Sequence, residues 1–347
     1  MNTRCARVTL GAALLLSGAT GTSASIAGAQ AITAPQCSVT STPVGVPGAF
    51  AQDACAKASD IFKFLAPQVG LALSGGNVML GEGGTLGGWG KRSFVLRVSA
   101  VDGRVPANDV PLSLIAAPVA SDFGAQRAPV PVPSFDAAIG IFRGVPFGLT
   151  NVGGVDLLLG ATVLPSVSRD EFRVESDGGG VAINYGVRIG LLQESALVPG
   201  VGVSVVRRRL PTTSISYFTS NDTLGVLDTR VSTTSIRLAA NKRFGLMGIG
   251  VGIGEDRLDS RTTIEAVINE NAGGIASRAV ARLDELRDET TRGTAFVNAS
   301  FGLAMAQLVL EVGQSRAGSI RETLNTFGDR RANEAYTYGS VGFGFRF

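Results

Sequence analysis

The sequence predicts an all-β fold, a transmembrane, antiparallel up-and-down β-barrel of about ten strands, within a range of roughly eight to fourteen. Three observations lead to this prediction. The chain begins with an export-type segment, alternates apolar and polar residues from Arg92 onward, and ends on an aromatic strand at Phe347. No apolar run approaches the roughly 20 residues that a membrane-spanning helix needs, so any span must be built from strands.

Residues 1–29 have the pattern of a cleaved signal peptide. Arg4 and Arg7 precede a short apolar run at 8–16, and the small residues at 27–29 fit a signal-peptidase site. The mature chain is therefore expected to begin at residue 30, outside the cytoplasm. Without Arg4 and Arg7, the 31 basic residues become 29 against 28 acidic ones, so no basic excess suggests nucleic acid as a partner.

Residues 30–91 precede the periodic part and are expected to form a periplasmic or plug segment. Asp53 is placed to cap a short helix over 54–65, which Pro67 should end. The stretch from 70 to 90 has nine glycines in 21 residues together with several apolar side chains. Such a stretch suits a segment packed against the inner wall of a barrel, and a disordered tail is the open alternative.

The two cysteines of the mature chain, Cys37 and Cys55, are expected to form one disulfide. An even number of cysteines in an exported chain favours pairing in an oxidising compartment. The enclosed loop is short, and the bridge should stabilise its segment by about 3 kcal/mol in the chain-entropy model. Two cysteines in a chain without histidine make a poor metal site, and no metal or cofactor is predicted.

Residues 92–347 carry the strand pattern of the barrel. Strands are predicted at about 92–102, 135–145, 153–164, 180–195, 200–218, 225–241, 246–258, 292–305, 308–320 and 335–347. Short connections alternate with long ones, 219–224 excepted, and short periplasmic turns with long external loops are typical of outer-membrane-type barrels. The long connections include 259–291, a charged external loop with a possible helix at 275–289, and a stiff Pro-Val-Pro-Val-Pro run at 129–133.

Strand parity places a set of polar side chains inside the barrel. The candidate lumen-lining residues are Arg97, Asp156, Arg188, Arg208, Arg237, Asn298 and Glu311. One interpretation is that paired charges fill a narrow barrel, because about eight strands leave room only for side chains. The other is that the inward glycines of the wall leave a cavity for residues 70–90 or for a solute. The sequence leaves both open.

The carboxyl-terminal strand resembles that of Gram-negative outer-membrane β-barrel proteins. Gly339, Phe343, Phe345 and Phe347 match the glycine-then-aromatics pattern that the barrel-assembly machinery reads in this class. The resemblance covers residues 92–347. It implies a location in the outer membrane, with membrane lipid, lipopolysaccharide and the assembly machinery as partners.

A second likeness is to the fatty-acid transporter family of outer-membrane barrels, which carry an amino-terminal plug. That family has an Asn-Pro-Ala motif in the plug. Here the corresponding region reads Gly-Gly-Asn-Val at 75–78, so the proline is missing, and fewer strands are predicted.

The absence of histidine argues against an enzyme, because no Ser-His-Asp or Cys-His arrangement can be built. The adjacent acids at 284–285 and 288–289 stand among arginines and are interpreted as solvated charge. The leading functional hypothesis is a plugged, porin-like channel for passive uptake of a small apolar solute. The alternative is a closed barrel with a structural or surface-contact role.

Overall fold

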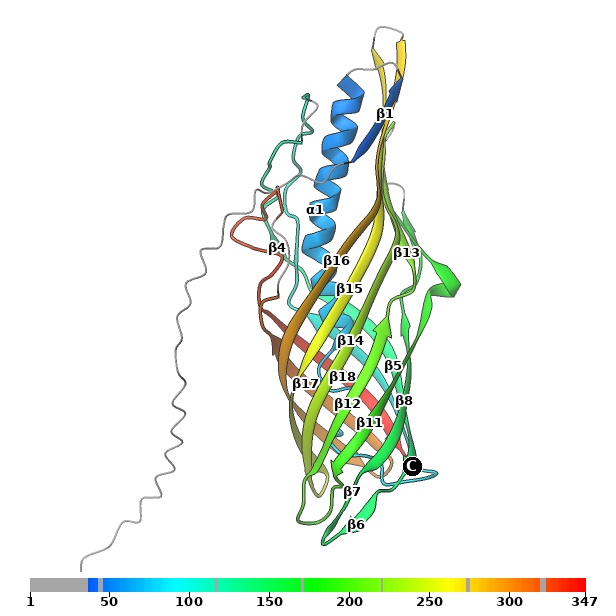
Figure 1. Cartoon of the computed structure of the whole chain (residues 1–347), viewed down its shortest axis with the longest axis vertical. Helices are drawn as coiled ribbons and strands as arrows, with labels where there is room; N and C mark the ends of the chain where they lie inside the picture. The colour runs from blue at the N-terminus through cyan, green and yellow to red at the C-terminus, as the bar shows by residue number, and fades with distance from the viewer. Residues whose placement is uncertain are drawn as a thin grey trace, which may run out of the picture. The chain divides into compact units, whose positions relative to one another are not determined.

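Ten antiparallel strands close into a ring in the computed structural model of the chain (Figure 1). The structure describes residues 37–42, 46–115, 118–169, 172–219, 221–272, 275–318 and 323–347, which belong to one compact unit. The predicted signal peptide, 1–29, lies outside them. The ring consists of β2 (Arg92–Val101), β5 (Val130–Phe142), β8 (Gly154–Val163), β11 (Val181–Leu192), β12 (Gly200–Arg209), β14 (Thr223–Phe244), β15 (Met247–Ala272), β16 (Ile275–Leu303), β17 (Ala306–Ser315) and β18 (Tyr336–Arg346).

Each strand of the ring pairs with the next along the chain, and β18 pairs with β2 to close it. The closing register runs from Tyr338 opposite Val101 to Arg346 opposite Ser93. A closed ring leaves no unpaired strand edge, which is the condition for strands to cross a bilayer. The predicted fold class is confirmed.

Shorter strands and one turn lie outside the ring. β1 (Ser38–Thr42) pairs with β16, β13 (Thr213–Phe218) pairs with β14, and β10 (Phe172–Ser176) joins β13 to β9 (Val167–Arg169). Two small hairpins are formed by β3 (Arg104–Val105) with β4 (Gln126–Arg127), and by β6 (Val145–Phe147) with β7 (Thr150–Val152). A 3₁₀ turn, η1 (Asp177–Gly180), precedes β11.

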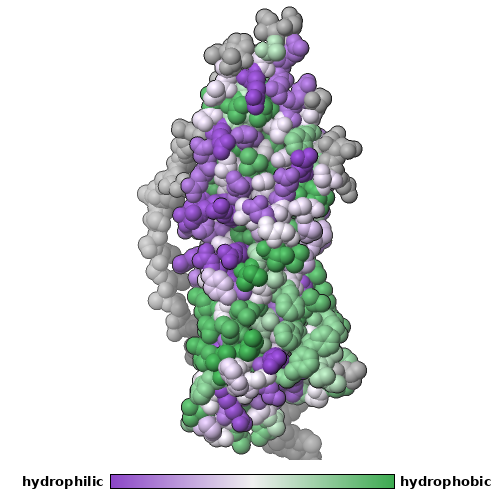
Figure 2. All heavy atoms as spheres, turned by 90° about the vertical axis from the view of Figure 1, so that its right-hand side faces the viewer, coloured by the Kyte–Doolittle hydropathy of each residue, from purple (hydrophilic) through white to green (hydrophobic). Residues whose placement is uncertain are grey.

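The outer face of the ring is apolar and the inner face is polar. On β11, Ile183 and Tyr185 are more than half exposed, whereas Asn184 between them is buried. The same alternation continues around the ring, and Figure 2 shows hydrophobic residues gathered over its lower part, with hydrophilic residues above. An apolar exterior around a polar interior is the surface of a transmembrane β-barrel.

The two ends of the barrel differ. At one end lie the start of β2, the end of β18 and the short turns 193–199, 245–246 and 304–305; we call this the turn end (Figure 1). At the other end β14, β15 and β16 continue beyond the ring as an extension, which we call the extension end. The β15–β16 pair runs without interruption from Met247 opposite Phe301 to Ala272 opposite Ile275, apart from one bulge near Thr262.

The predicted loop at 259–291 and its possible helix at 275–289 are therefore wrong. Residues 259–272 and 275–291 are strand, and their buried side chains include Ile264, Ala266, Ala279 and Ala281. These side chains form an apolar sheet face for a helix to pack on. Residues 275–289 have apolar side chains at helical spacing but also alternate as a strand does. Packing of the alternating face against α1 decides for the strand.

The amino-terminal helix is longer than predicted. α1 runs Val46–Ser74, includes Pro67, and was expected only over 54–65. Proline lacks the N–H that would bond four residues back and costs about 3 kcal/mol or more in a helix interior. Packing offsets this loss, because α1 is buried against β14, β15 and β16 on one side and loop residues on the other. Asp53 does not cap the helix but lies inside it. No described helix is long and apolar enough to cross a membrane.

Two predicted boundaries also shift because of prolines. The run at 129–133 is not a free loop, because β5 begins at Val130 and pairs with β2 there. Its prolines are tolerated because β8 pairs with β5 only from Ser134 onward, so one edge needs no N–H donor. The predicted strand at 200–218 is split into β12 and β13, with Pro211 in the gap.

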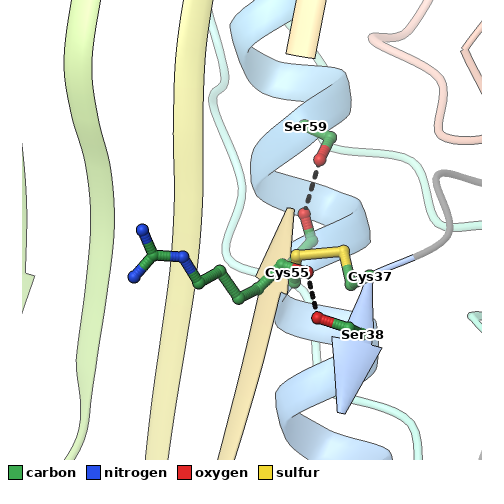
Figure 3. Close-up of a disulfide and its surroundings, with 5 residues drawn as sticks. Cys37, Ser38, Cys55 and Ser59 are labelled. Atoms are coloured by element: carbon green, nitrogen blue, oxygen red, sulfur yellow. Dashed lines mark hydrogen bonds between the residues drawn. A yellow bond between two sulfur atoms is a disulfide. The ribbon is translucent and has the colours of Figure 1, made fainter. Parts of the chain in front are cut away.

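The disulfide between Cys37 and Cys55 is present and ties the start of β1 to α1 (Figure 3). Ser38 Oγ donates to the Arg282 carbonyl on β16 at 3.0 Å, and Ser59 Oγ donates to the Cys55 carbonyl at 2.8 Å. β1 covers the edge of β16 beyond the point where β17 ends. The bridge thus holds β1, α1 and the β16 edge together at the extension end.

Replacing both cysteines, as Cys37→Ser with Cys55→Ser, should loosen β1 and the first turns of α1 without opening the ring. Loss of the bridge, which spans 18 residues, removes about 3 kcal/mol of local stability. Hydrogen exchange should rise in 38–60 and stay unchanged in β17 and β18. Equal protection of 38–60 in both forms would show that packing alone holds this segment.

Candidate functional site

The lumen is occupied by residues 75–91, which connect the end of α1 to β2 and which we call the lumen segment. Every residue from Gly70 to Leu86 is buried. Its backbone touches the wall. A Cβ at Gly83 would lie 2.5 Å from the Asn241 backbone nitrogen, and a Cβ at Gly140 of the wall would lie 2.2 Å from the Gly88 oxygen. Only glycine permits this approach of two backbones, which explains the composition of the segment.

The seven candidate lumen-lining residues all lie on the inner face of the ring, with exposed fractions of 0% to 5%. They come from seven different strands, so the ring directs them at the lumen segment from all around it. Asp156 lies on β8, Arg188 on β11, Arg208 on β12 and Glu311 on β17.

Two wall arginines bond the end of α1. Arg208 donates to the Ser74 carbonyl at 2.7 Å and to the Val78 carbonyl at 3.0 Å. Arg237 donates to the Gly76 carbonyl at 2.9 Å and to the Gly75 carbonyl at 3.2 Å. The last carbonyls of a helix have no partner within the helix, and its carboxyl-terminal end carries partial negative charge. The two guanidinium groups satisfy both demands.

Carboxylates on the wall balance these arginines. Arg237 forms two bonds to Asp256, at 2.6 and 2.7 Å. Asp136 lies between two arginines, 3.0 Å from Arg97 and 3.1 Å from Arg208. Arg97 also donates to the Asn77 carbonyl at 2.9 Å. Asp136 and Asp256 were missed in the sequence, although strand parity from the outward Phe135 and Ile253 indicates both.

A second group of charges binds the lumen segment nearer the turn end of the barrel. Arg188 lies 2.9 Å from Glu82 of the lumen segment and 2.7 Å from Asp156 of the wall. Asp156 in turn accepts the backbone N–H of Leu86 at 3.1 Å. Glu311 accepts the backbone N–H of Asn77 at 2.9 Å. Every one of these groups is buried, so each bond acts in a low dielectric.

The inward glycines of β15 do not leave a cavity. A Cβ at Gly252 would lie 2.2 Å from the ring of Phe296, and one at Gly250 would lie 2.5 Å from Asn298 Oδ1. The larger neighbours on β16 cover these glycines. The void beside Val78 and Met79 has a volume of about 10 Å³, room for about one water molecule. Beside β15, therefore, the space inside the wall is filled by side chains, as the first of the two interpretations expects.

The described residues contain no group of three or more histidine, cysteine or carboxylate side chains placed to hold a metal ion.

The predicted assembly-signal residues lie on β18 and just after it. Phe343, Phe345 and Phe347 point outward and are about half exposed, and Gly339 pairs with Ala100 of β2. Their role as an assembly signal stays a prediction.

No protein-family model matches the chain, and no curated protein matches it. Solved structures share parts of its arrangement. The translocator domain of the autotransporter NalP from Neisseria meningitidis is 10% identical, with 75% of this chain and 89% of that chain covered and a TM-score of 0.35.

Two other structures score lower. The outer-membrane channel DcaP of Acinetobacter baumannii is 9% identical, covering 77% and 100%, with a TM-score of 0.20. A Pseudomonas aeruginosa FadL homologue is 9% identical, covering 74% and 90%, with a TM-score of 0.21. The ring closure and the apolar exterior are those of a transmembrane β-barrel, which places the outer face of the ring in contact with membrane lipid.

Arg188→Met should strongly destabilise the barrel, because it leaves Glu82 and Asp156 buried without their cation. Removing one partner of a buried ion pair typically costs about 3–5 kcal/mol. The matched control is Arg243→Met, whose ion pair with Glu194 is partly exposed and should contribute at most about 1 kcal/mol. The measurement is the guanidinium-induced unfolding midpoint in micelles. Equal midpoints for the two variants would contradict a structural role for the buried charges.

Proposed function

We propose that the protein is a closed outer-membrane barrel that holds a rigid platform on the cell surface. The platform consists of β1, the first part of α1, and the extension formed by β14, β15 and β16. The single observation that carries the proposal is the course of the chain. Cys37 lies at the extension end, and Arg92 begins the barrel at the turn end. The residues between them pass through the lumen.

Orientation follows from the class of barrel. In outer-membrane barrels the short turns face the periplasm and the longer connections face outside. The turn end of this ring carries the short turns, so it faces the periplasm. The extension end then faces outside, and Cys37 with it. The lumen segment thus acts as a tether that connects an external helix to the barrel wall.

The platform is tightly packed, as a surface for contact requires. Asp53, inside α1, accepts the backbone N–H groups of Ser113 at 2.8 Å and Val119 at 3.0 Å, which fastens one loop to the helix. Asp60 accepts both the backbone and the side-chain N–H of Asn325 at 2.9 Å, which fastens a second loop. Burial raises the pKa of Asp60, although these bonds oppose the shift.

Aromatic stacking and surface charge complete the platform. The ring of Phe64 on α1 stacks on Phe327 with 4.0 Å between centroids. The outer face of the extension carries exposed cross-strand ion pairs such as Arg282 with Glu265 and Arg287 with Asp259. Such pairs contribute little to stability and keep the surface solvated. A solvated, ordered surface suits contact with another molecule better than passage of a solute.

The plugged channel for a small apolar solute, which the sequence favoured, is the competing function. It requires the lumen segment to move aside. Instead, the segment is bonded by Arg97, Arg188, Arg208, Arg237 and Glu311. The barrel therefore stays closed unless all of these bonds break together.

An epitope inserted directly before Cys37 should be bound by antibody on intact cells, because the proposed topology places this point outside. The control is the same epitope inserted after Leu197, in a turn at the turn end, which should be bound only after the outer membrane is permeabilised. Recognition of the Cys37 epitope only in permeabilised cells would overturn the proposed topology.

Purified wild-type protein should carry no ionic current in planar bilayers and no flux of small apolar solutes into liposomes, because the lumen segment fills the ring. Arg243→Met, changed in the partly exposed ion pair with Glu194 at the turn end, should behave identically. A solute-dependent flux through the wild-type protein would replace the closed-barrel proposal by the plugged channel.

A further inference from the structure

A groove with a volume of about 390 Å³ lies at the extension end, outside the lumen. One wall is α1, the second is the loop at 106–112 with Phe123, and the third comes from β13, β14, β15 and the turn at 219–222. We call it the helix groove. Pockets that bind small molecules have volumes of about 300–1,000 Å³. The groove lies within this range.

Small side chains leave the groove open. Ala54 and Ala58 lie one turn apart on the same face of α1, and Ala266 faces them from β15. Larger apolar residues, Ile61 on α1 and Leu224 on β14 among them, line the rest. The three alanines are buried at the deep end of the groove, and the result is a mostly apolar lining that suits the apolar body of a ligand.

The walls are held in place, so the groove is preformed. Cys55, next to Ala54, carries the disulfide to Cys37. Asp53 bonds the loop that carries the opposite wall, at Ser113 and Val119. A preformed pocket does not lose ordering free energy on binding.

The rim of the groove is acidic. Asp109 and Asp222 both line it, and neither has a cationic partner among the described residues. The Asp222 carboxylate accepts the backbone N–H of Asn269 at 2.9 Å. Lys57, the basic residue of the lining, is already paired with Asp53. Tyr217, about half exposed, adds an aromatic ring that attracts cations.

We propose that the helix groove binds a small amphiphilic cation. Its apolar body would lie against Ile61, Leu112 and Leu224, and its ammonium group would lie at the rim, near Asp109 and Asp222. This binding does not depend on whether the barrel is closed, because the groove and the lumen are separate.

The test uses the purified full-length protein in micelles and two probes with the same apolar body. 2-(1-Naphthyl)ethylamine carries a positive charge, and 3-(1-naphthyl)propanoate carries a negative one. Equilibrium dialysis against protein-free micelles separates binding from partition into detergent. The amine is expected to bind saturably, at one site, and at least ten-fold more tightly than the carboxylate.

Variants then test whether the amine binds in the helix groove. Ala58→Phe fills the groove from α1, and Leu112→Trp fills it from the loop, where the backbone can adjust if the helix variant fails to fold. Either should abolish saturable binding of the amine. Asp109→Asn with Asp222→Asn should weaken the amine about five- to ten-fold and leave the carboxylate unchanged. Exposed Leu114, outside the groove lining, provides the control Leu114→Ala, which should bind as the wild type does.

Two results would overturn the proposal. Equal affinity for amine and carboxylate, unchanged in the double asparagine variant, would show that the rim does not select a cation. Amine binding that survives in folded Leu112→Trp would show that the probe binds elsewhere.

Discussion

The structure depends on one constraint, that a helix ends inside a membrane barrel, where water cannot bond its last carbonyl groups. Arg208 replaces that water at the carbonyl of Ser74, the last helix residue, and Arg237 does the same at the carbonyls of Gly75 and Gly76 just beyond it. Each arginine is buried and needs a carboxylate, which Asp136 on β5 supplies to Arg208 and Asp256 on the adjacent β15 supplies to Arg237. The charged interior is therefore the set of partners that a backbone crossing a membrane requires, and no open path is needed to explain it.

Passage of a backbone through a narrow barrel also explains the glycines of the lumen segment and of the wall beside it. A ten-stranded ring is narrow, and the lumen segment fits only where its backbone lies directly against the wall. Gly83 meets Asn241, and wall residue Gly140 meets Gly88, without room for a Cβ. With the segment bonded on every side, the barrel anchors the helix that leaves it. The disulfide at Cys37 and Cys55 then completes a platform joined to the barrel through both the lumen and β16.

Much of the wall was predictable because strand parity has a period of two and needs no tertiary information. Alternation around Ile183 and Tyr185 already indicates which side faces lipid, and it directs Arg97, Arg188 and Glu311 inward. It also indicates Asp136 and Asp256, which were overlooked. Pairing among these charges was not predictable, because Arg188 reaches Glu82, 106 residues away in the chain. Only the folded ring brings such residues together.

By itself, the sequence determined a ring of about ten strands with an apolar exterior and one disulfide, and it predicted export and a glycine-rich segment beside the wall. Each of these is a local pattern of residue types. Tertiary structure alone decided that α1 continues past Pro67 to Ser74, that residues 259–272 pair with 275–291, and that wall arginines bond the residues after α1. The physical reason is shared burial: α1 and the alanine face of β15 and β16 each lack a partner until the other is present.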